Sequence, residues 1–211
     1  MLINMKKLLT LLFSILLFWS PSVFADDISD FEIEGISIGD SLLDYMTEDE
    51  ILKEIERNKN DYYYLKEPYK YSEVYILKDF PTYESISVIV KNNSSNPYLS
   101  NKNDKFTILT VRGQIYYIED FDSCIQKRDE IAEVVSRMFK NIQKGENTVS
   151  HTADPTGDSF IDGYYFNFDS GAFVELYCSN FEETFRTKMN WTEGLSVVVK
   201  SKEIFTWLDD Y

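Results

Sequence analysis

The sequence predicts an α+β fold in which helices pack on one face of an antiparallel sheet. Several short segments alternate apolar and polar residues at the strand period, and three other segments repeat apolar residues at the helical period. Single helical segments separate groups of about three strands, an order typical of antiparallel sheets. We expect one domain over residues 26–211, whose order allows a pseudo-repeat of 31–120 and 121–211 as two helix-plus-meander units.

The first helical segment covers residues 41–58. Asp40 is the expected N-cap of its beginning, since a short polar side chain can accept a hydrogen bond from the first free backbone N–H groups. Thr47 and Glu50 then have the spacing of a capping box. A second start inside the segment predicts one broken helix or two short ones.

Strands are predicted next, at residues 74–77 and 85–90 and along a longer segment at 106–118. Gly113 lies inside the longer segment and predicts a bulge or a turn there, because glycine often marks an interruption of a strand. Residues 92–104 are rich in Asn, Ser and Lys, which indicates an exposed hairpin loop.

The clearest helix is predicted to begin at Asp122 or Ser123 and to stop at Gly145. A loop over residues 146–159 is expected to follow it. The helix has one apolar stripe at the helical period, made of Cys124, Ile131, Val135, Met138 and Ile142.

The last third of the chain alternates again at the strand period. Residues 160–168 and 172–178 are predicted strands around a turn at 169–171, and 195–199 is a further strand. Ser201 is the expected cap of a short final helix.

The N-terminus has the pattern of a secretory signal. Lys6 and Lys7 precede an apolar run over residues 8–19, and Val23-Phe24-Ala25 offers a cleavage site after Ala25. Twelve helical residues rise about 18 Å, which is short of the roughly 30 Å hydrocarbon core of a bilayer. Residues 1–25 are therefore predicted to be a signal peptide, with a membrane anchor or a buried helix as the alternatives. The mature chain is expected to be periplasmic or secreted, without stable membrane insertion.

The sequence holds two cysteines, Cys124 and Cys178. An even count in an exported chain favours one disulfide, while two separately buried thiols are the alternative. Both residues lie on the apolar face of their predicted elements, so a bridge between a helix and a strand is sensible. It would close a loop of 54 residues.

Composition excludes some classes of function. The chain has 36 acidic and 21 basic residues and a formal net charge of −15. Nucleic acids and anionic lipids both require a cationic surface, so neither is an expected partner. Hydrophobic residues make up 44% of the chain and aromatic residues 16%, which argues against disorder.

Several segments carry a resemblance to a family. The run from Phe31 to Tyr45, FEIEGISIGDSLLDY, resembles the opening of a group of small exported proteins of marine alphaproteobacteria for which no activity is known. The block around Cys124 with 126–131, residues 175–178 and the ending at 201–208 are similar to that group too. The resemblance implies an exported, Cys-paired α+β domain and no particular activity.

A weaker likeness rests on Gly39-Asp40-Ser41-Leu42 opening a helix. It is to small periplasmic helix-plus-meander modules, such as the outer-membrane assembly accessory lipoproteins and the β-lactamase-inhibitory proteins. The chain lacks the lipidation cysteine of the former. A likeness of fold does not transfer function.

The residues nominate no catalytic centre. The single histidine, His151, lies in a polar stretch, where a solvated loop position is the preferred interpretation. Asp154, Asp158 and Asp162 could hold calcium, but they lack the EF-hand pattern, and a solvated acidic loop is preferred. We expect no metal and no cofactor. The many acids prevent any carboxylate pair from being chosen for glycosidic chemistry.

Clustered aromatic residues allow two interpretations. They are strand residues with one face buried, which is preferred, or an exposed surface that stacks on sugars or anchors a protein. The residues are Tyr62, Tyr63, Tyr64, Tyr69, Tyr71 and Tyr75, then Tyr164, Tyr165 and Phe166.

The leading functional hypothesis is a non-catalytic, soluble periplasmic binding or accessory protein. Its expected partner is an envelope protein or a small polar ligand. A carboxylate-dependent hydrolase of the cell envelope is the first alternative, and a structural or stress-related envelope protein is the second.

Overall fold

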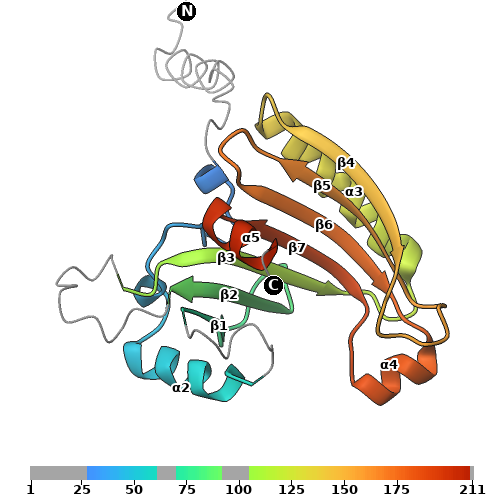
Figure 1. The fold of residues 1–211 in the computed structure, drawn as a ribbon, viewed down its shortest axis with the longest axis horizontal. Coiled ribbons are helices and arrows are strands. Elements are labelled where there is room, and N and C mark those ends of the chain that lie inside the picture. The colour runs from blue at the N-terminus through green and yellow to red at the C-terminus, as the bar shows by residue number, and fades with distance from the viewer. Residues whose placement is uncertain (1–27, 61–69, 92–104, 210–211) are drawn as a thin grey trace, which may run out of the picture.

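The computed structural model describes residues 28–60, 70–91 and 105–209 (Figure 1). The predicted signal peptide, the predicted hairpin loop at 92–104, and Tyr62, Tyr63, Tyr64 and Tyr69 lie outside these ranges. Within the described ranges, no helix is both long and apolar enough to cross a membrane.

Seven strands form one antiparallel sheet in the order β1-β2-β3-β7-β6-β5-β4. The α+β class with an antiparallel sheet is therefore confirmed. The strands are β1 (Tyr71–Tyr75), β2 (Ser85–Lys91), β3 (Ile108–Tyr116), β4 (Gln143–Ser150), β5 (Phe160–Asn167), β6 (Phe173–Asn180) and β7 (Gly194–Lys200). The helices are α2 (Glu48–Asn58), α3 (Phe121–Met138), α4 (Glu183–Met189) and α5 (Lys202–Asp209), with 3-10 turns at Ile28–Asp30 and Leu42–Asp44.

The helices divide between the two faces of the sheet. In Figure 1, α3 lies behind the sheet and the short α5 lies in front of it. Helices α2 and α3 pack on one face, where Ile51, Val135 and Leu176 belong to the main core. Helix α5 covers part of the other face, where Ile204 packs with Ile89 in a second, smaller core. The expectation of helices on one face thus holds for α2 and α3 but not for α5.

A disulfide joins the middle of the chain to its last third. Cys124 in the first turn of α3 is bonded to Cys178 in β6, and the two Cα atoms are 6.0 Å apart. Both residues are buried in the main core. The bond therefore anchors the helix to the centre of the sheet across the face that the helix covers.

The first helix begins as the sequence predicts. Thr47 caps α2, its N–H donates to Glu50 Oε2 (2.8 Å), and the Glu50 N–H donates back to Thr47 Oγ1 (3.4 Å). This is the reciprocal geometry of a capping box. Asp40 is not the cap of the preceding turn, which Ser41 begins. Its carboxylate instead accepts from the Ser37 N–H and the Tyr45 hydroxyl.

Helix α3 ends earlier than the sequence predicts. Asp120 caps α3 through the Ser123 N–H, and the helix ends at Met138 rather than at Gly145. The predicted loop over 146–159 begins instead as strand β4, which pairs only with β5. An edge strand exposed to solvent needs no apolar alternation, and charged residues protect such an edge. The polar sequence QKGENTVS therefore gave no sign that this segment is a strand.

Gly113 does not mark a bulge. It lies in regular pairing in β3, opposite Ile86 and Val197. The irregularity occurs between Ile89 and Val90, where β3 contributes Leu109 as an extra residue. Glycine is required at 113 for a different reason, since a Cβ there would lie 2.6 Å from the ring of Tyr83.

Gly113→Ala is expected to lower the free energy of unfolding by about 1–3 kcal/mol through overpacking. The added Cβ would also lie 3.0 Å from Ile33 Cγ2, so two side chains would have to move to admit it. Burial of that ring raises the pKa of Tyr83 to about 12. Urea unfolding followed by circular dichroism measures the change.

The matched control is Gly145→Ala in β4. Its Cβ would meet the far end of the ring of Tyr165, which is exposed and can swing aside. A loss at Gly145 as large as that at Gly113 would contradict this account of overpacking.

Candidate ligand-binding groove

A hollow of about 700 Å³ lies on the face of the sheet that α5 partly covers. We call it the polar groove. Strands β1, β2, β3, β7, β6 and β5 all contribute to it, and the segment after α4 closes one end. The polar residues that the strands contribute include Glu73, Ser87, Thr110, Arg112, Gln114, Glu175, Tyr177, Ser179, Ser196 and Lys200.

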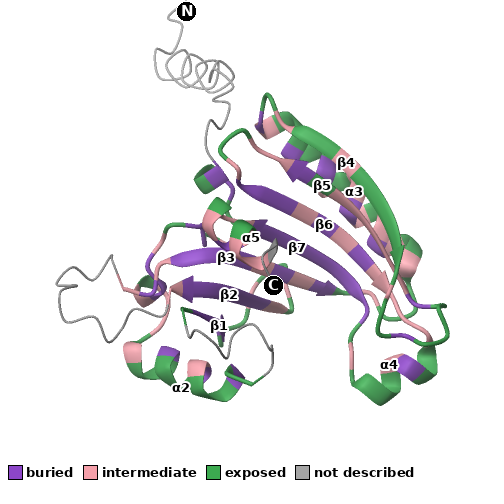
Figure 2. Cartoon of the chain, in the orientation of Figure 1, coloured by how far each residue is buried: buried purple, intermediate pink, exposed green. Residues whose placement is uncertain are grey.

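Strand alternation places these side chains in the groove. Thr110, Arg112 and Gln114 alternate in β3 with core residues such as Val111, and Ser196 lies between two core residues of β7. Alternate side chains of a strand point to opposite faces of the sheet. Figure 2 shows that β2, β3 and β7 are nonetheless buried along most of their length. The polar face is therefore largely withdrawn from solvent.

The charged groups of the polar groove are already engaged. Lys200 Nζ donates to Glu175 Oε2 at 2.7 Å, and Arg112 Nη2 donates to the hydroxyl of Tyr177. Glu73 and Arg112 each have a further interaction. The groove therefore presents two acidic and two basic side chains that hold partners, rather than a free charge of either sign.

Thr110 differs from the other hydroxyl groups on the floor of the groove. Its residue is 5% exposed, and its Oγ1 has no hydrogen-bond partner in the part of the chain that the structure describes. A buried hydroxyl left without a partner costs about 1–3 kcal/mol. Such groups are rare in native proteins and each requires an explanation. A ligand that bonds Thr110 would supply one.

Aromatic rings form the end of the polar groove near α4. His151, Phe181 and Trp191 line it, with Phe185 of α4 behind them. The ring centroid of His151 is 4.8 Å from that of Trp191 and 5.5 Å from that of Phe181. His151 is thus a half-buried member of an aromatic cluster, which corrects the solvated loop position expected from sequence. Its Nδ1 is buried and has no hydrogen-bond partner among the described residues.

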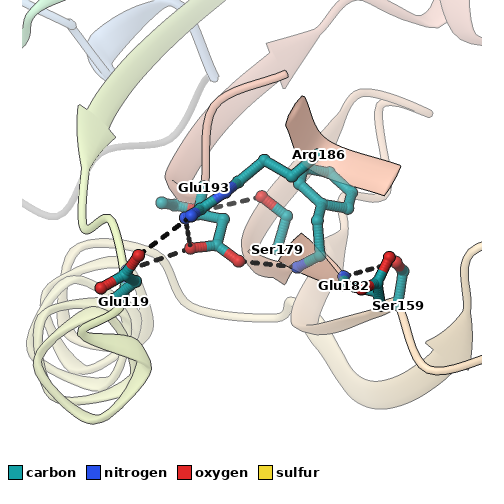
Figure 3. Close-up of polar contacts among 8 residues, drawn as sticks. Glu119, Ser159, Ser179, Glu182, Arg186 and Glu193 are labelled. Atoms are coloured by element: carbon teal, nitrogen blue, oxygen red, sulfur yellow. Dashed lines mark hydrogen bonds and ion pairs between the residues drawn. The ribbon is translucent and has the colours of Figure 1, made fainter. Parts of the chain in front are cut away.

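A buried ion-pair network holds this aromatic end in place (Figure 3). Glu193, just before β7, accepts from Arg186 of α4 at 2.7 Å, and its other oxygen accepts from the Phe181 N–H at 2.8 Å. The N–H of Glu119, between β3 and α3, also donates to Glu193, at 3.0 Å. A hydrogen bond to the Glu119 carboxylate and the charge of Glu193 raise the pKa of Arg186. The network therefore ties three separate segments to the wall of the groove.

The loop before β5 is fastened to the same wall. The Glu182 N–H donates to Ser159 Oγ at 2.8 Å, and the Ser159 N–H donates to Asp154 at 2.9 Å. Hydrogen bonds first from the Ser159 side chain, and then from Thr156, hold the pKa of Asp154 well below its usual range, although burial opposes the shift. Asp154 is thus a structural acceptor inside its loop.

Asp154→Asn is expected to lower stability at neutral pH and to flatten its acid dependence. Because the folded-state pKa is lowered, the contribution of Asp154 is present above the unfolded value of about 4 and is lost as the pH falls below it. Urea unfolding at a series of pH values from neutral into the acid range measures this. Asp158→Asn, an exposed change in the same loop, is the control. Superimposable pH curves for the wild type and Asp154→Asn would contradict the assignment.

The three aspartates considered for calcium engage different partners. Asp154 accepts from its own loop, and Asp162 in β5 is paired with Arg128 of α3 and with Thr148 of β4. Asp158 is exposed. No group of three metal-binding side chains occurs within residues 28–60, 70–91 and 105–209.

Helix α5 closes the other end of the polar groove with Leu208. Beside it, the hydroxyl of buried Tyr71 donates to Glu203 at 2.8 Å, and Lys91 pairs with the same carboxylate at 2.6 Å. Burial alone would raise the pKa of Glu203, but the hydrogen bonds from Lys91 and Tyr71 outweigh it, and the pKa is lowered. Burial and the Glu203 bond raise the pKa of Tyr71. The second end is thus also held by polar contacts, which are partly buried.

The aromatic residues singled out from sequence have different positions. Tyr71 and Phe166 are buried, and Tyr164 faces α3, where the guanidinium of Arg128 lies 4.3 Å from its ring centroid. Tyr75 lines the polar groove. Tyr165 is exposed and stacks on Phe173 outside it. Two of these five residues are therefore buried in strands, two are half-buried, and one is exposed.

The pentapeptide Gly35-Ile36-Ser37-Ile38-Gly39 has the Gly-x-Ser-x-Gly spacing of a nucleophile elbow, which links a strand to a helix. The structure does not place a nucleophile there. Ser37 is buried, and its N–H donates to Asp40 (3.0 Å) within a turn. The Gly39 N–H is bonded to β3, whereas His151 follows β4, an edge strand that β7, β6 and β5 separate from β3. Ser37 and the histidine therefore form no catalytic pair.

Apart from Tyr75 and His151, the residues that line the polar groove were not singled out from sequence. The alternation around Thr110, Arg112 and Ser196 predicts strands, but its polar positions indicate only a side that faces solvent. Only the placement of α5 and of the segment after α4 makes that side a hollow. A comparison with protein-family models, curated proteins and solved structures found no match to this chain.

Proposed function

We propose that this protein is an exported, non-catalytic binding protein that holds a small polar ligand in the polar groove. The observation that carries the proposal is the buried Thr110 hydroxyl without a partner on the floor of a hollow of about 700 Å³. Sites for small molecules are concave, have a similar size, and carry a few polar groups that orient the ligand.

Export is part of the proposal and rests on three supports. The sequence predicts a signal peptide at 1–25, a disulfide joins Cys124 to Cys178, and the described helices include none that could span a membrane. Stable disulfides are typical of oxidising compartments such as the periplasm. The net charge of −15 excludes nucleic acid as the ligand.

The hydrolase alternative has less support. It requires two carboxylates that face each other across a cleft and act on a substrate. Of the two in the polar groove, Glu175 is held by Lys200 at 2.7 Å. The contacts thus occupy this carboxylate rather than leave it for chemistry.

Thr110→Val tests the proposal. The substitution removes the unpartnered hydroxyl and keeps the shape, so the ligand-free protein is expected to be as stable as the wild type or more stable. The ligand, by contrast, should bind about tenfold more weakly, which corresponds to one lost hydrogen bond. The dialysable fraction of a periplasmic extract is added to the purified protein as the source of ligand. Thermal shift and native mass spectrometry then measure binding.

The matched control is Thr148→Val, which removes a hydroxyl that is bonded to Asp162 on the other face of the sheet. It should leave the ligand-induced thermal shift unchanged. Absence of any bound small molecule or thermal shift in the wild type would overturn the proposal, and capture of an envelope protein on the same face would favour the accessory-protein alternative.

A further inference from the structure

The polar groove has a lining that suits one chemical class of ligand. We infer that the ligand is a neutral saccharide, an inference that rests on the proposed function and specifies it. Three observations lead to it: the balance of charge in the groove, its density of hydroxyl and amide groups, and the rings at one end.

The balance of charge excludes strongly ionised ligands. Glu73 and Glu175 are matched in the groove by Arg112 and Lys200, and each of the four has a partner. The chain as a whole carries 15 net negative charges, which disfavours a polyanion. A cation would need a free carboxylate, which these pairings do not leave. A neutral ligand is consistent with both facts.

The floor of the groove offers hydrogen bonds rather than charge. Ser87, Thr110 and Ser196 supply hydroxyls, each of which can both donate and accept, and Gln114 supplies an amide. Sugar hydroxyls have the same dual capacity, so they can bond such groups whichever way each is oriented. The unpartnered Thr110 Oγ1 is the position where such a bond is missing.

The aromatic rings of the groove suit the apolar faces of a sugar. A pyranose has apolar C–H faces as well as polar edges, and it binds best where rings and hydrogen-bonding groups meet. Trp191 and Phe181 line one end of the groove, and Tyr116 and Tyr177 line its side. Tyrosine and tryptophan provide an apolar ring with a polar tip in one side chain. The volume of about 700 Å³ is several times that of one hexose, which favours an oligosaccharide.

The experiment measures binding of uncharged oligosaccharides to the oxidised mature chain. The panel contains β-1,4-linked glucose and N-acetylglucosamine trimers, and an α-1,4-linked glucose trimer. The comparison panel contains a galacturonic acid trimer, a mixture of amino acids, and nucleosides. Isothermal calorimetry gives the affinities. A Trp207→Phe variant leaves Trp191 as the one tryptophan of residues 26–211, so its fluorescence reports contact with the aromatic end.

A neutral trimer is expected to bind, to change the Trp191 fluorescence, and to bind about tenfold more weakly to Thr110→Val. Tyr116→Ala should weaken it by a similar factor. Tyr116 is 41% exposed, so the loss of its ring should not unfold the protein. Tyr165→Ala is the matched control, because this exposed tyrosine lies outside the groove and its loss should leave the affinity unchanged.

The outcomes separate the two proposals. Binding of only charged compounds, amino acids or nucleosides, weakened by Thr110→Val, would overturn the saccharide and leave the binding function standing. Saccharide binding that neither Thr110→Val nor Tyr116→Ala weakens would overturn the assignment to this groove. If neither panel nor the periplasmic extract shifts the melting temperature, both proposals fail.

Discussion

Replacing Cys124 and Cys178 together by alanine is expected to lower the free energy of unfolding by about 4 kcal/mol. The bond closes a loop of 54 residues, and in the chain-entropy model a loop of this length contributes that much by restricting the unfolded chain. This is a large fraction of the total stability of a domain of this size. Guanidinium unfolding of the oxidised wild type and of the double variant measures the difference.

Reduction of the wild type provides the control. The reduced protein should unfold well below the oxidised protein and near the midpoint of the double alanine variant, because both lack the cross-link. Both cysteines are fully buried, so reduction requires a mild denaturant and then its removal. Equal midpoints for oxidised and reduced wild type would show that the bond contributes no stability, and alkylation of both thiols in native material would show that it is not formed.

Glu193→Ala is expected to lower the free energy of unfolding by about 3 kcal/mol. The side chains of Glu193 and Arg186 are 7% and 15% exposed, so the loss of the carboxylate would leave a largely buried guanidinium without its closest partner. The N–H groups of Phe181 and Glu119 would lose their acceptor as well. Breaking a buried ion pair from one side costs more than the pair itself contributes, because the remaining charge stays desolvated.

The same substitution should loosen the aromatic end of the polar groove. Trp191 lies two residues before Glu193, and the Phe181 N–H is bonded directly to the lost carboxylate. The near-ultraviolet circular dichroism of the aromatic cluster is therefore expected to fall in Glu193→Ala before the protein unfolds. Urea unfolding and this spectrum are the two measurements.

Glu119→Ala is the matched control for this network. Its carboxylate pairs with the same Arg186 at 3.1 Å, but its side chain is 75% exposed. Solvent screens such a pair, so the expected loss is below about 1 kcal/mol. If both alanine variants lost the same stability, burial would not be what makes the Glu193 pair important.

Helices α2, α3 and α5 and most strands were predictable because their signals are local, whereas the short helix α4 was not predicted. The capping box of Thr47 and Glu50 forms as expected, and the apolar stripe that contains Cys124 and Val135 faces the core. A hydrogen bond between neighbours along the chain, or a repeat of 3.6 residues, requires no knowledge of the rest of the fold. Strand β4 was missed because an edge strand carries no such repeat.

The candidate site was not predictable for a related reason. Thr110 and Ser196 belong to separate strands, β3 and β7, that become neighbours only in the sheet. Nothing local distinguishes their polar side from an ordinary solvent-facing one. His151 was placed in solvent for the same reason, because Phe181 and Trp191 reach it from about 30 to 40 residues further along the chain.

The sequence by itself determined the α+β class, the capping box, the helical stripe of α3 and the acidic balance that disfavours nucleic acid, because each depends on residue type and short-range spacing. Only the tertiary structure decided that one polar sheet face is a hollow and that the Thr110 hydroxyl lies there without a hydrogen-bond partner among the described residues. It also decided that aromatic rings from the segments after β4, after β6 and after α4 close one end of that hollow. Those properties arise where strands distant in sequence are brought together, and a polar side chain is exposed or buried according to what that assembly lays over it.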